Sequence, residues 1–433
     1  METKFAKFLR KVTEYLTYLF IFILPWQVKL ILRPGETNYS EISLQLCFII
    51  LIVILILFFW LRLKENDCET GCKYTVYSLA AFGFFAFVSI FFAPDKLLAF
   101  YRYFILLIGI SLFFAIRLGV EPRTYKDALF DKTFIIYSFL LSIFFQASLG
   151  IYQFLTQSSF AFKYLGLAAH NPDTLGTAVV ETASGRWLRA YGGMDHPNIL
   201  GGTLAITLIF VAYFLAKKKM LNTKKEIWSS ILLFVFYFVA LYALFFTFSR
   251  GAWIALAVGL LTLLISFIIN KDKWILSRLV ALIFFSAILL VIVAAPFRDL
   301  LMVRIDSQTR LEQKSINERL SYIDQAKNLS KNNLLTGVGI GNYSLAASFA
   351  DNNKKAVWDY QPVHNVFLLI LSESGIFSLL SFLVFLFFLM KNGRRELYAW
   401  AIMTPLLVIM MVDHWLFSLP YGVFFFFLLL GLI

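Results

Sequence analysis

The feature that most constrains this chain is a series of apolar runs, each about 18–22 residues long, that recur along the sequence. A run of that length crosses the hydrocarbon core of a bilayer as one α-helix, so the pattern predicts a polytopic helical membrane protein. The runs are continuously apolar and do not alternate, which argues against a β-barrel. Hydrophobic residues make up 60% of the 433 residues, well above the roughly 45–50% of soluble domains.

We expect about twelve spans, forming a single integral membrane domain over residues 1–433. The expected spans are 15–32, 42–61, 74–92, 97–116, 133–154, 198–215, 228–248, 252–269, 275–295, 363–390, 397–412 and 415–432. Two polar segments interrupt them, Thr156–Asp195 and Arg298–Tyr360. In the longer segment, Leu320, Ile323 and Ala326 predict the apolar face of a short amphipathic helix. We expect this segment to lie as a helical loop over one face of the bundle.

The net charge of +13 serves topology, because Lys and Arg gather in alternate short loops. The positive-inside rule then places both termini in the cytoplasm and both polar segments outside. Membrane lipids are the expected surroundings, and no nucleic acid is expected as a partner. Cys47 lies in an expected span, whereas Cys68 and Cys72 share a short loop without a nearby His, so we interpret these two as free thiols on the reducing side. The basic N-terminus predicts an uncleaved first helix.

Three arginines on the predicted outer face could bind an anion. Arg250 stands in a tight Ser249-Arg250-Gly251 turn between two spans, where a charge is costly and suggests function, although snorkelling to the interface is the alternative. Arg319 could lie beside the apolar side of its helix, or be a solvated charge paired with Glu318 or Asp324.

The third arginine, Arg189, precedes the Asp195-His196-Pro197-Asn198 start of a span. Pro197 suits the first turn of that helix, with His196 near its N-cap. The free N–H groups of a helix start favour anions, although a merely structural loop is the alternative.

The predicted catalytic base is His364, in Pro362-Val-His364-Asn365 at the outer end of a span. Histidine is the usual general base near neutral pH; the alternative is a structural helix-start residue. Asn365 is adjacent, and Glu373 follows as a membrane-embedded carboxylate that needs a partner. Asp413 lies at another outer helix end. We expect His196, Asn365, Glu373 and Asp413 to be supporting residues.

The predicted outer face lacks an Asp-x-Asp pattern, which a Mg²⁺ ion holding a diphosphate would favour. It offers arginines instead, which bind phosphate bidentately and stay charged. We therefore expect neither a metal nor a cofactor.

These features resemble the O-antigen ligase family of bacterial surface-polysaccharide ligases and polymerases. The resemblance rests on the twelve spans, the long loop between spans 9 and 10, and several motifs, and it covers about Thr133 to the end of the chain. The motifs are Ser249-Arg250-Gly251, Asp195–Asn198, Gly337-x-Gly-x-Gly341, Pro362–Asn365 and Glu373-Ser-Gly375.

The resemblance implies a metal-independent, inverting glycosyltransferase of GT-C-like architecture in the bacterial inner membrane. Its donor would be an undecaprenyl-diphosphate-linked glycan, and its acceptor a sugar hydroxyl of lipid A–core on the periplasmic face. His364 would deprotonate the acceptor, while Arg250 and Arg319, assisted by Arg189, would hold the diphosphate. The alternatives are a polysaccharide polymerase, a protein O-oligosaccharyltransferase, or a transporter of lipid-linked glycan.

Overall fold

The computed structural model describes residues 4–63, 73–120, 128–218, 223–306, 309–351, 356–392 and 397–433. Cys68 and Cys72, interpreted above as free thiols, lie outside the described residues. Cys47 is buried and free.

The described chain is mainly helical. Its first part contains α1 (Lys4–Ile23), β1 (Lys29–Arg33), β2 (Ile42–Gln45), α2 (Leu46–Leu63), α3 (Lys73–Ser89) and α4 (Lys96–Val120). The middle contains α5 (Lys132–Thr156), β3 (Val179–Thr182), β4 (Gly185–Leu188), α6 (Pro197–Lys217), α7 (Lys224–Phe246), α8 (Arg250–Ile269) and α9 (Lys273–Ala294). The last part contains α10 (Arg298–Asp306), α11 (Arg310–Asn332), α12 (Tyr343–Ala350), α13 (Val366–Asn392), α14 (Leu397–Val412), α15 (Trp415–Ser418) and α16 (Pro420–Leu432).

Within the described ranges, eight helical stretches are long and apolar enough to cross a membrane, which fits a polytopic membrane protein. Three further apolar helices are shorter: Leu46–Arg62, Ala399–Val412 and Pro420–Leu432. The basic amphipathic α1 belongs to neither group.

Three predicted spans differ from the helices. The second was expected to begin at Ile42, but Ile42–Gln45 forms β2 and α2 begins at Leu46. The first was expected to continue to Leu32, but α1 ends at Ile23 and residues 29–33 pair antiparallel with β2. Pro25 follows the helix end, where it removes a backbone donor and prevents continuation. The last span is divided into α15 and α16 at Leu419, whose extended backbone precedes Pro420.

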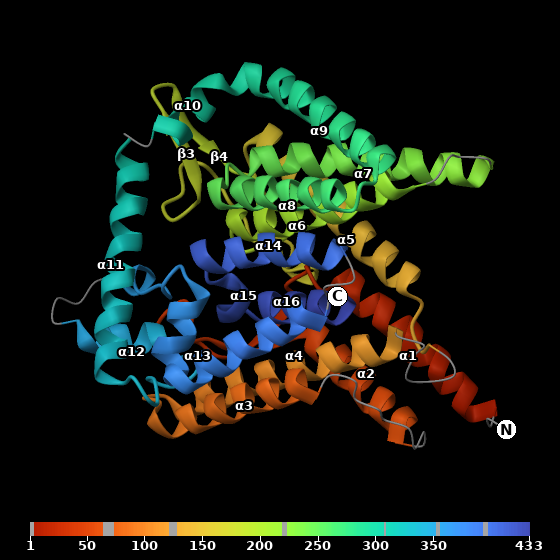
Figure 1. The fold of residues 1–433 in the computed structure, drawn as a ribbon. Helices are drawn as coiled ribbons and strands as arrows, with labels where there is room; N and C mark the ends of the chain where they lie inside the picture. The colour runs from red at the N-terminus through yellow and green to blue at the C-terminus, as the bar shows by residue number, and fades with distance from the viewer. Residues whose placement is uncertain are drawn as a thin grey trace.

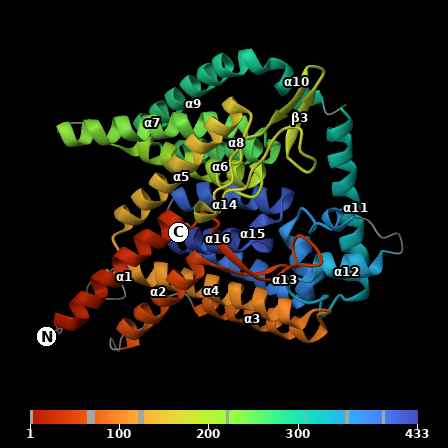
Figure 2. The same ribbon diagram turned by 180° about the vertical axis from the view of Figure 1, so that it is seen from behind.

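The long helices lie alongside one another, and α11 runs across their ends (Figures 1 and 2). The N-terminus lies at the opposite end of the bundle. At the centre is α6, of which an 18-residue window is 94% buried, packed by α5, α7, α8, α9 and α14. Because α6 is enclosed on all sides, the residues at its start hold fixed positions at the α11 end.

The polar segment 298–360 is largely helical, and α11 is much longer than the short helix predicted. Its buried face is formed by Tyr322, Ala326 and Leu329, at the spacing of one helix face. Leu320, predicted on that face, is instead 56% exposed, because it lies two residues, about 200° around the helix, from Tyr322.

The glycine turn between α11 and α12 packs against a kink in α13. Gly375 lies at the kink with a φ of 80°. A Cβ at Gly337, itself at φ +66°, would fall 2.2 Å from the carbonyl carbon of Glu373, so only glycine allows this approach. The amides of Val338 and Gly339 donate to the carbonyls of Ser372 and Glu373. The turn thus fastens the polar segment to a membrane-spanning helix.

Candidate active site

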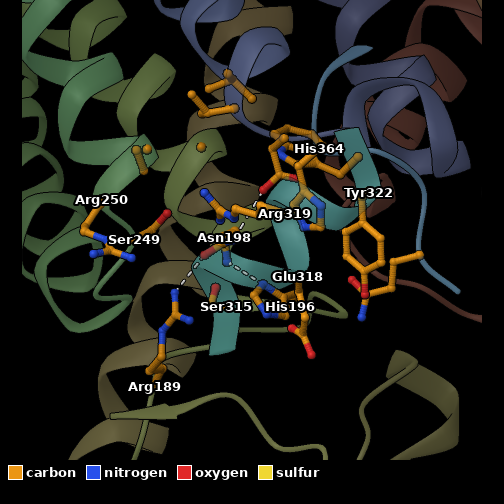
Figure 3. A pocket seen from close by; sticks show the side chains of 18 of the residues that line it. Arg189, His196, Asn198, Ser249, Arg250, Ser315, Glu318, Arg319, Tyr322 and His364 are labelled. Atoms are coloured by element: carbon orange, nitrogen blue, oxygen red, sulfur yellow. Dashed lines mark hydrogen bonds between the residues drawn. The ribbon is translucent and has the colours of Figure 1, made fainter. Parts of the chain in front are cut away.

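A cavity of about 200 Å³ lies between α11 and the ends of the bundle. The segments that line it are the β4–α6 connection, the start of α6, the α7–α8 turn, α10, α11, the residues just before α13 and the α14–α15 turn. Figure 3 shows Ser249 and Arg250 on one side of it and His364 and Tyr322 on the other. Its charged and histidine residues are Arg189, His196, Arg250, Arg304, Glu318, Arg319, His364 and Asp413.

The start of α6 is built as the sequence predicted. Pro197 occupies the first turn, and Nδ1 of His196 caps the helix by accepting from the amide of Asn198 at 3.1 Å. The side chain of Asn198 then joins two charged residues. Its Oδ1 accepts from Nη2 of Arg189 at 2.8 Å, and its Nδ2 donates to Asp413 at 3.3 Å.

The α7–α8 turn binds two arginines through its carbonyl groups. Nε of Arg189 donates to the carbonyl of Thr247 at 2.6 Å, and Nη2 of Arg304 donates to that of Phe248 at 2.7 Å. The carbonyls at the end of a helix carry partial negative charge, so the end of α7 is a suitable place for cations. Burial lowers the pKa of Arg189 to about 9, with a further contribution from Arg304, and the guanidinium stays charged at neutral pH.

Glu312 of α11 joins two of the cavity's arginines. Its carboxylate lies 2.9 Å from Nη2 of Arg250 and forms a second ion pair with Arg304. Glu312 is 3% exposed, so its pairing partly offsets the cost of holding these cations together. Arg250 is therefore fixed by the polar segment and does not extend freely toward the interface.

Arg319 is the arginine of the cavity that remains available. The two acids that could have paired with it are engaged elsewhere, Glu318 by Lys314 and Asp324 by Lys327. Among the described residues, its side chain makes neither an ion pair nor a hydrogen bond. Figure 3 shows it projecting from α11 into the cavity with His364 and Asn198. A partly buried cation in this state favours an anionic ligand.

His364 is held between two aromatic rings. Tyr322 stacks on it with ring centroids 5.8 Å apart, and His414 approaches edge-on at 4.8 Å. Its Nδ1 is buried and has no hydrogen-bond partner in the described chain. The ring is thus oriented by packing, while one nitrogen remains unpaired.

The surroundings of His364 favour its neutral form. Burial lowers the pKa of His364, His414 and Arg319 lower it further, and Asp413 opposes them. Burial raises the pKa of Asp413, but its electrostatic interactions with the imidazoles of His364 and His414, and then with Arg319, outweigh burial and lower the pKa below its usual value. At neutral pH a neutral imidazole therefore stands beside an ionised carboxylate, as general-base catalysis requires.

Nitrogen or oxygen atoms of His364, Asp413 and His414 lie within 4.8 Å of one another, so their types and proximity could suit a metal ion. Other features oppose one. Asp413 accepts from the amide of His414 at 2.8 Å and from Asn198. The ligand atoms of a tetrahedral zinc site stand about 2.1 Å from the metal and hence roughly 3.4 Å from one another. This spacing is tighter than the 4.8 Å within which the atoms of these three residues lie. The arginines around the cavity also repel a cation.

Two of the predicted supporting residues do not line the cavity. Asn365 caps α13 by accepting from the amide of Leu368, and its Nδ2 donates to the carbonyl of Met411. Glu373 lies on a second cavity of about 40 Å³, where it accepts from the amides of Gly341 and Tyr343. Both residues support elements around the site from outside it.

Sequence reasoning missed Arg304, Glu312 and Tyr322 as site residues. The first two are charges in a polar segment, where charged residues are ordinary, so their types carried no signal. Tyr322 lies three residues after Arg319 and thus on a neighbouring part of the helix face, which was the available indication.

One comparison with known proteins finds a family. A family model described as O-antigen ligase matches residues 235–383. The match includes Arg250, Arg304, Arg319 and His364, whereas Arg189, His196 and Asp413 lie outside it. A search of curated proteins finds no match.

Proposed function

Because the chain is a member of the O-antigen ligase family, we propose that it transfers a glycan from undecaprenyl diphosphate to a sugar hydroxyl of lipid A–core. Family membership implies glycan transfer of the ligase or polymerase type from a lipid-linked substrate. The identity of the donor and that of the acceptor are our proposal. The observation that carries it is that one cavity at the end of the helical bundle holds His364, with a ring nitrogen that has no hydrogen-bond partner, and Arg319, whose side chain is unpaired among the described residues.

In the proposed reaction, an unprotonated nitrogen of His364 takes the proton from the acceptor hydroxyl. The acceptor oxygen attacks the anomeric carbon, and the bond from that carbon to the diphosphate oxygen breaks. The electron pair leaves with the diphosphate, which becomes more negative. Attack on the face opposite the leaving group inverts the configuration.

The arginines would stabilise the departing diphosphate. Arg319 supplies a guanidinium that has no partner in the part of the chain that the structure describes, and Arg250 lies across the cavity from it. Arg189 contributes chiefly its charge, because two of its nitrogens already donate to Thr247 and Asn198. Cations placed where negative charge develops lower the barrier directly. The expected chemistry is therefore independent of metal.

The expected setting is the bacterial inner membrane. With both termini cytoplasmic, as the basic loops predict, α11 and the cavity face the periplasm. The apolar surfaces of the bundle would accommodate the polyprenyl chain.

The test is transfer by the purified protein in lipid nanodiscs. An undecaprenyl-diphosphate-linked glycan is offered with lipid A–core, a second lipid-linked glycan or a Ser/Thr peptide. We expect product with lipid A–core, and unchanged product in excess EDTA. Exclusive elongation of the lipid-linked glycan would instead make the protein a polymerase, and peptide glycosylation a protein transferase. Activity lost in EDTA and restored by Mg²⁺ would contradict the metal-independent mechanism.

A further inference from the structure

Arg102 is a charged residue inside the apolar helix α4, and the proposed chemistry gives it no role. Such a residue in a membrane-spanning helix is costly and suggests function. Its guanidinium is bound internally: Nη1 donates to the carbonyl of Ser418 at 2.9 Å, and Nη2 donates to that of Tyr39 at 2.6 Å. It therefore joins α4 to the end of α15 and to the β1–β2 connection.

Both partners of Arg102 contact the same histidine. Oγ of Ser418 lies 2.6 Å from Nδ1 of His414, and its amide donates to the carbonyl of that residue at 3.0 Å. The ring of Tyr39 meets the ring of His414 edge-on, with centroids 5.3 Å apart. One guanidinium thus fixes two neighbours of His414. In Figure 2 the red N-terminal segment runs beside the blue C-terminal helices, consistent with this connection.

His414 in turn contacts the proposed base and its carboxylate neighbour. Its ring lies edge-on to His364 at 4.8 Å, and its amide donates to Asp413 at 2.8 Å. The chain of contacts from Arg102 to His364 is therefore continuous. We propose that Arg102 is a positioning residue, which holds His414 through Tyr39 and Ser418 and so sets the orientation of His364. This inference rests on the proposed role of His364 as base.

The second cavity supports a role at a distance from the substrate. Arg102 lines this 40 Å³ cavity and is not among the residues of the larger one. Glu373 lines it too, so an acidic side chain shares this cavity with Arg102. A Cβ at Gly341 would fall 2.2 Å from Cγ of Arg102. The glycine turn and Glu373 do not line the main cavity, and both lie beside Arg102.

Steady-state transfer separates positioning from substrate binding. We expect Arg102→Met to lower kcat about ten- to a hundredfold, with the donor KM unchanged, because a displaced base impairs the chemical step. Ser418→Ala should lower kcat in the same way. Arg102→Lys should recover part of the rate, since an ammonium keeps the charge but lacks the planar fork that joins two carbonyls.

Arg33→Met is the matched control. Arg33 of β1 pairs with Asp95 at the start of α4 and so joins the same two parts of the chain. Among the described residues, no hydrogen bond, ion pair or ring contact joins Arg33 to His414. Its replacement should leave kcat near the wild-type value. An equal loss of kcat in Arg33→Met and Arg102→Met would mean that Arg102 only anchors the hairpin, and would overturn the inference.

The second readout does not depend on activity. The chain has 4 histidines, so isotope-labelled imidazoles can be followed individually by NMR. In Arg102→Met and Ser418→Ala, the signals of His414 and His364 should shift, while His170, which stacks on Tyr191, should stay in place. If Arg102→Met does not fold, Arg102→Lys takes its place in both readouts, because the lysine keeps the charge but cannot join the two carbonyls as the guanidinium does.

The outcomes distinguish the two proposals. A wild-type protein that transfers glycan, with unchanged kcat in Arg102→Met and Ser418→Ala, overturns the positioning role alone. Unmoved signals of His414 and His364 in these variants overturn it as well, whatever the activity. A wild-type protein that transfers glycan to none of the acceptors overturns the proposed function, whereas the NMR result still decides whether Arg102 positions His414.

Discussion

At the scale of single residues, the proposed reaction requires a histidine that stays neutral and an arginine that has no partner among the described residues. Both states follow from neighbours more than from residue type. His364 is enclosed by Tyr322 and His414 among cationic groups, and the acids near Arg319 are paired elsewhere. The histidine would accept the proton, and the arginine would stabilise the charge that develops on the leaving group.

The lowered pKa of His364 makes a prediction about pH. A base is competent above its pKa, and burial holds that of His364 below the ordinary 6.5. The acid limb of kcat/KM, which reports the free enzyme, should therefore lie below pH 6.5. The acid limb of kcat should lie at a higher pH, because the negative charge of a bound diphosphate offsets the charge of the arginines and raises the pKa of His364. An acid limb of kcat/KM above pH 7 that persists in Asp413→Asn would contradict this.

Arg319→Ala should weaken donor binding about ten- to a hundredfold, the loss expected for charge-assisted hydrogen bonds. Its thermal stability should stay near wild type, since the side chain has no partner in the described structure. The measurement is the Kd of undecaprenyl diphosphate in nanodiscs. Lys327→Ala on the same helix, where the lysine pairs with Asp324, is the control. Equal affinity in both variants would remove Arg319 from the diphosphate site.

At the scale of elements, the ion pairs of Glu312 join α11 to Arg304 of α10 and to Arg250 at the start of α8. Glu312→Gln should lower the unfolding temperature, because Arg250 and the more buried Arg304 lose their shared carboxylate. Breaking a buried pair costs about 3–5 kcal/mol, and the partial exposure of Arg250 reduces this figure. Asp324→Asn, at an exposed pair on the same helix, should change little.

Added undecaprenyl diphosphate should restore part of the stability of Glu312→Gln, since its charge replaces that of the carboxylate near the two arginines. Thermal unfolding monitored by intrinsic fluorescence measures both effects. An unfolding temperature equal to that of the wild type would show that these ion pairs do not hold α11 in place.

The long apolar helices could be predicted closely from the sequence, because run length alone determines them. Their ends depended on local breakers: Pro25 and Pro420 divide runs that hydropathy treats as continuous. The length of α11 was not predictable from three apolar positions, since its contacts with α13 define the buried face. Leu320 shows the consequence, because a small error in helix phase exposes a residue expected to be buried.

At the scale of the whole molecule, the sequence identified which residues to consider but not all of their connections. Arg189, Arg250, Arg319, His196, Asp413 and His364 line one cavity, since helix ends that share a membrane face are close in space. Arg304 was missed because charged residues are common in a polar segment, so its charge alone did not indicate a site. Arg102 was missed although it stands in a predicted span, where its charge was the available signal. The tertiary contacts that select among charged residues are not encoded locally.

The orientation of the molecule can be tested by labelling in intact cells. In a variant without cysteine, Asn317→Cys on α11 should react with a membrane-impermeant maleimide from the periplasm. Lys224→Cys, at the start of α7, should react only after the membrane is broken. Both positions are exposed. The reverse pattern would place the cavity on the cytoplasmic side and contradict the proposed orientation.

The most direct test of the central claim is glycan transfer by His364→Ala, measured together with donor binding. We expect transfer to be lost while the Kd for undecaprenyl diphosphate remains near the wild-type value, because the histidine removes a proton and the arginines hold the donor. His170→Ala, which changes a histidine outside the cavity, should transfer normally. Full transfer by His364→Ala would contradict the claim that this residue is the base.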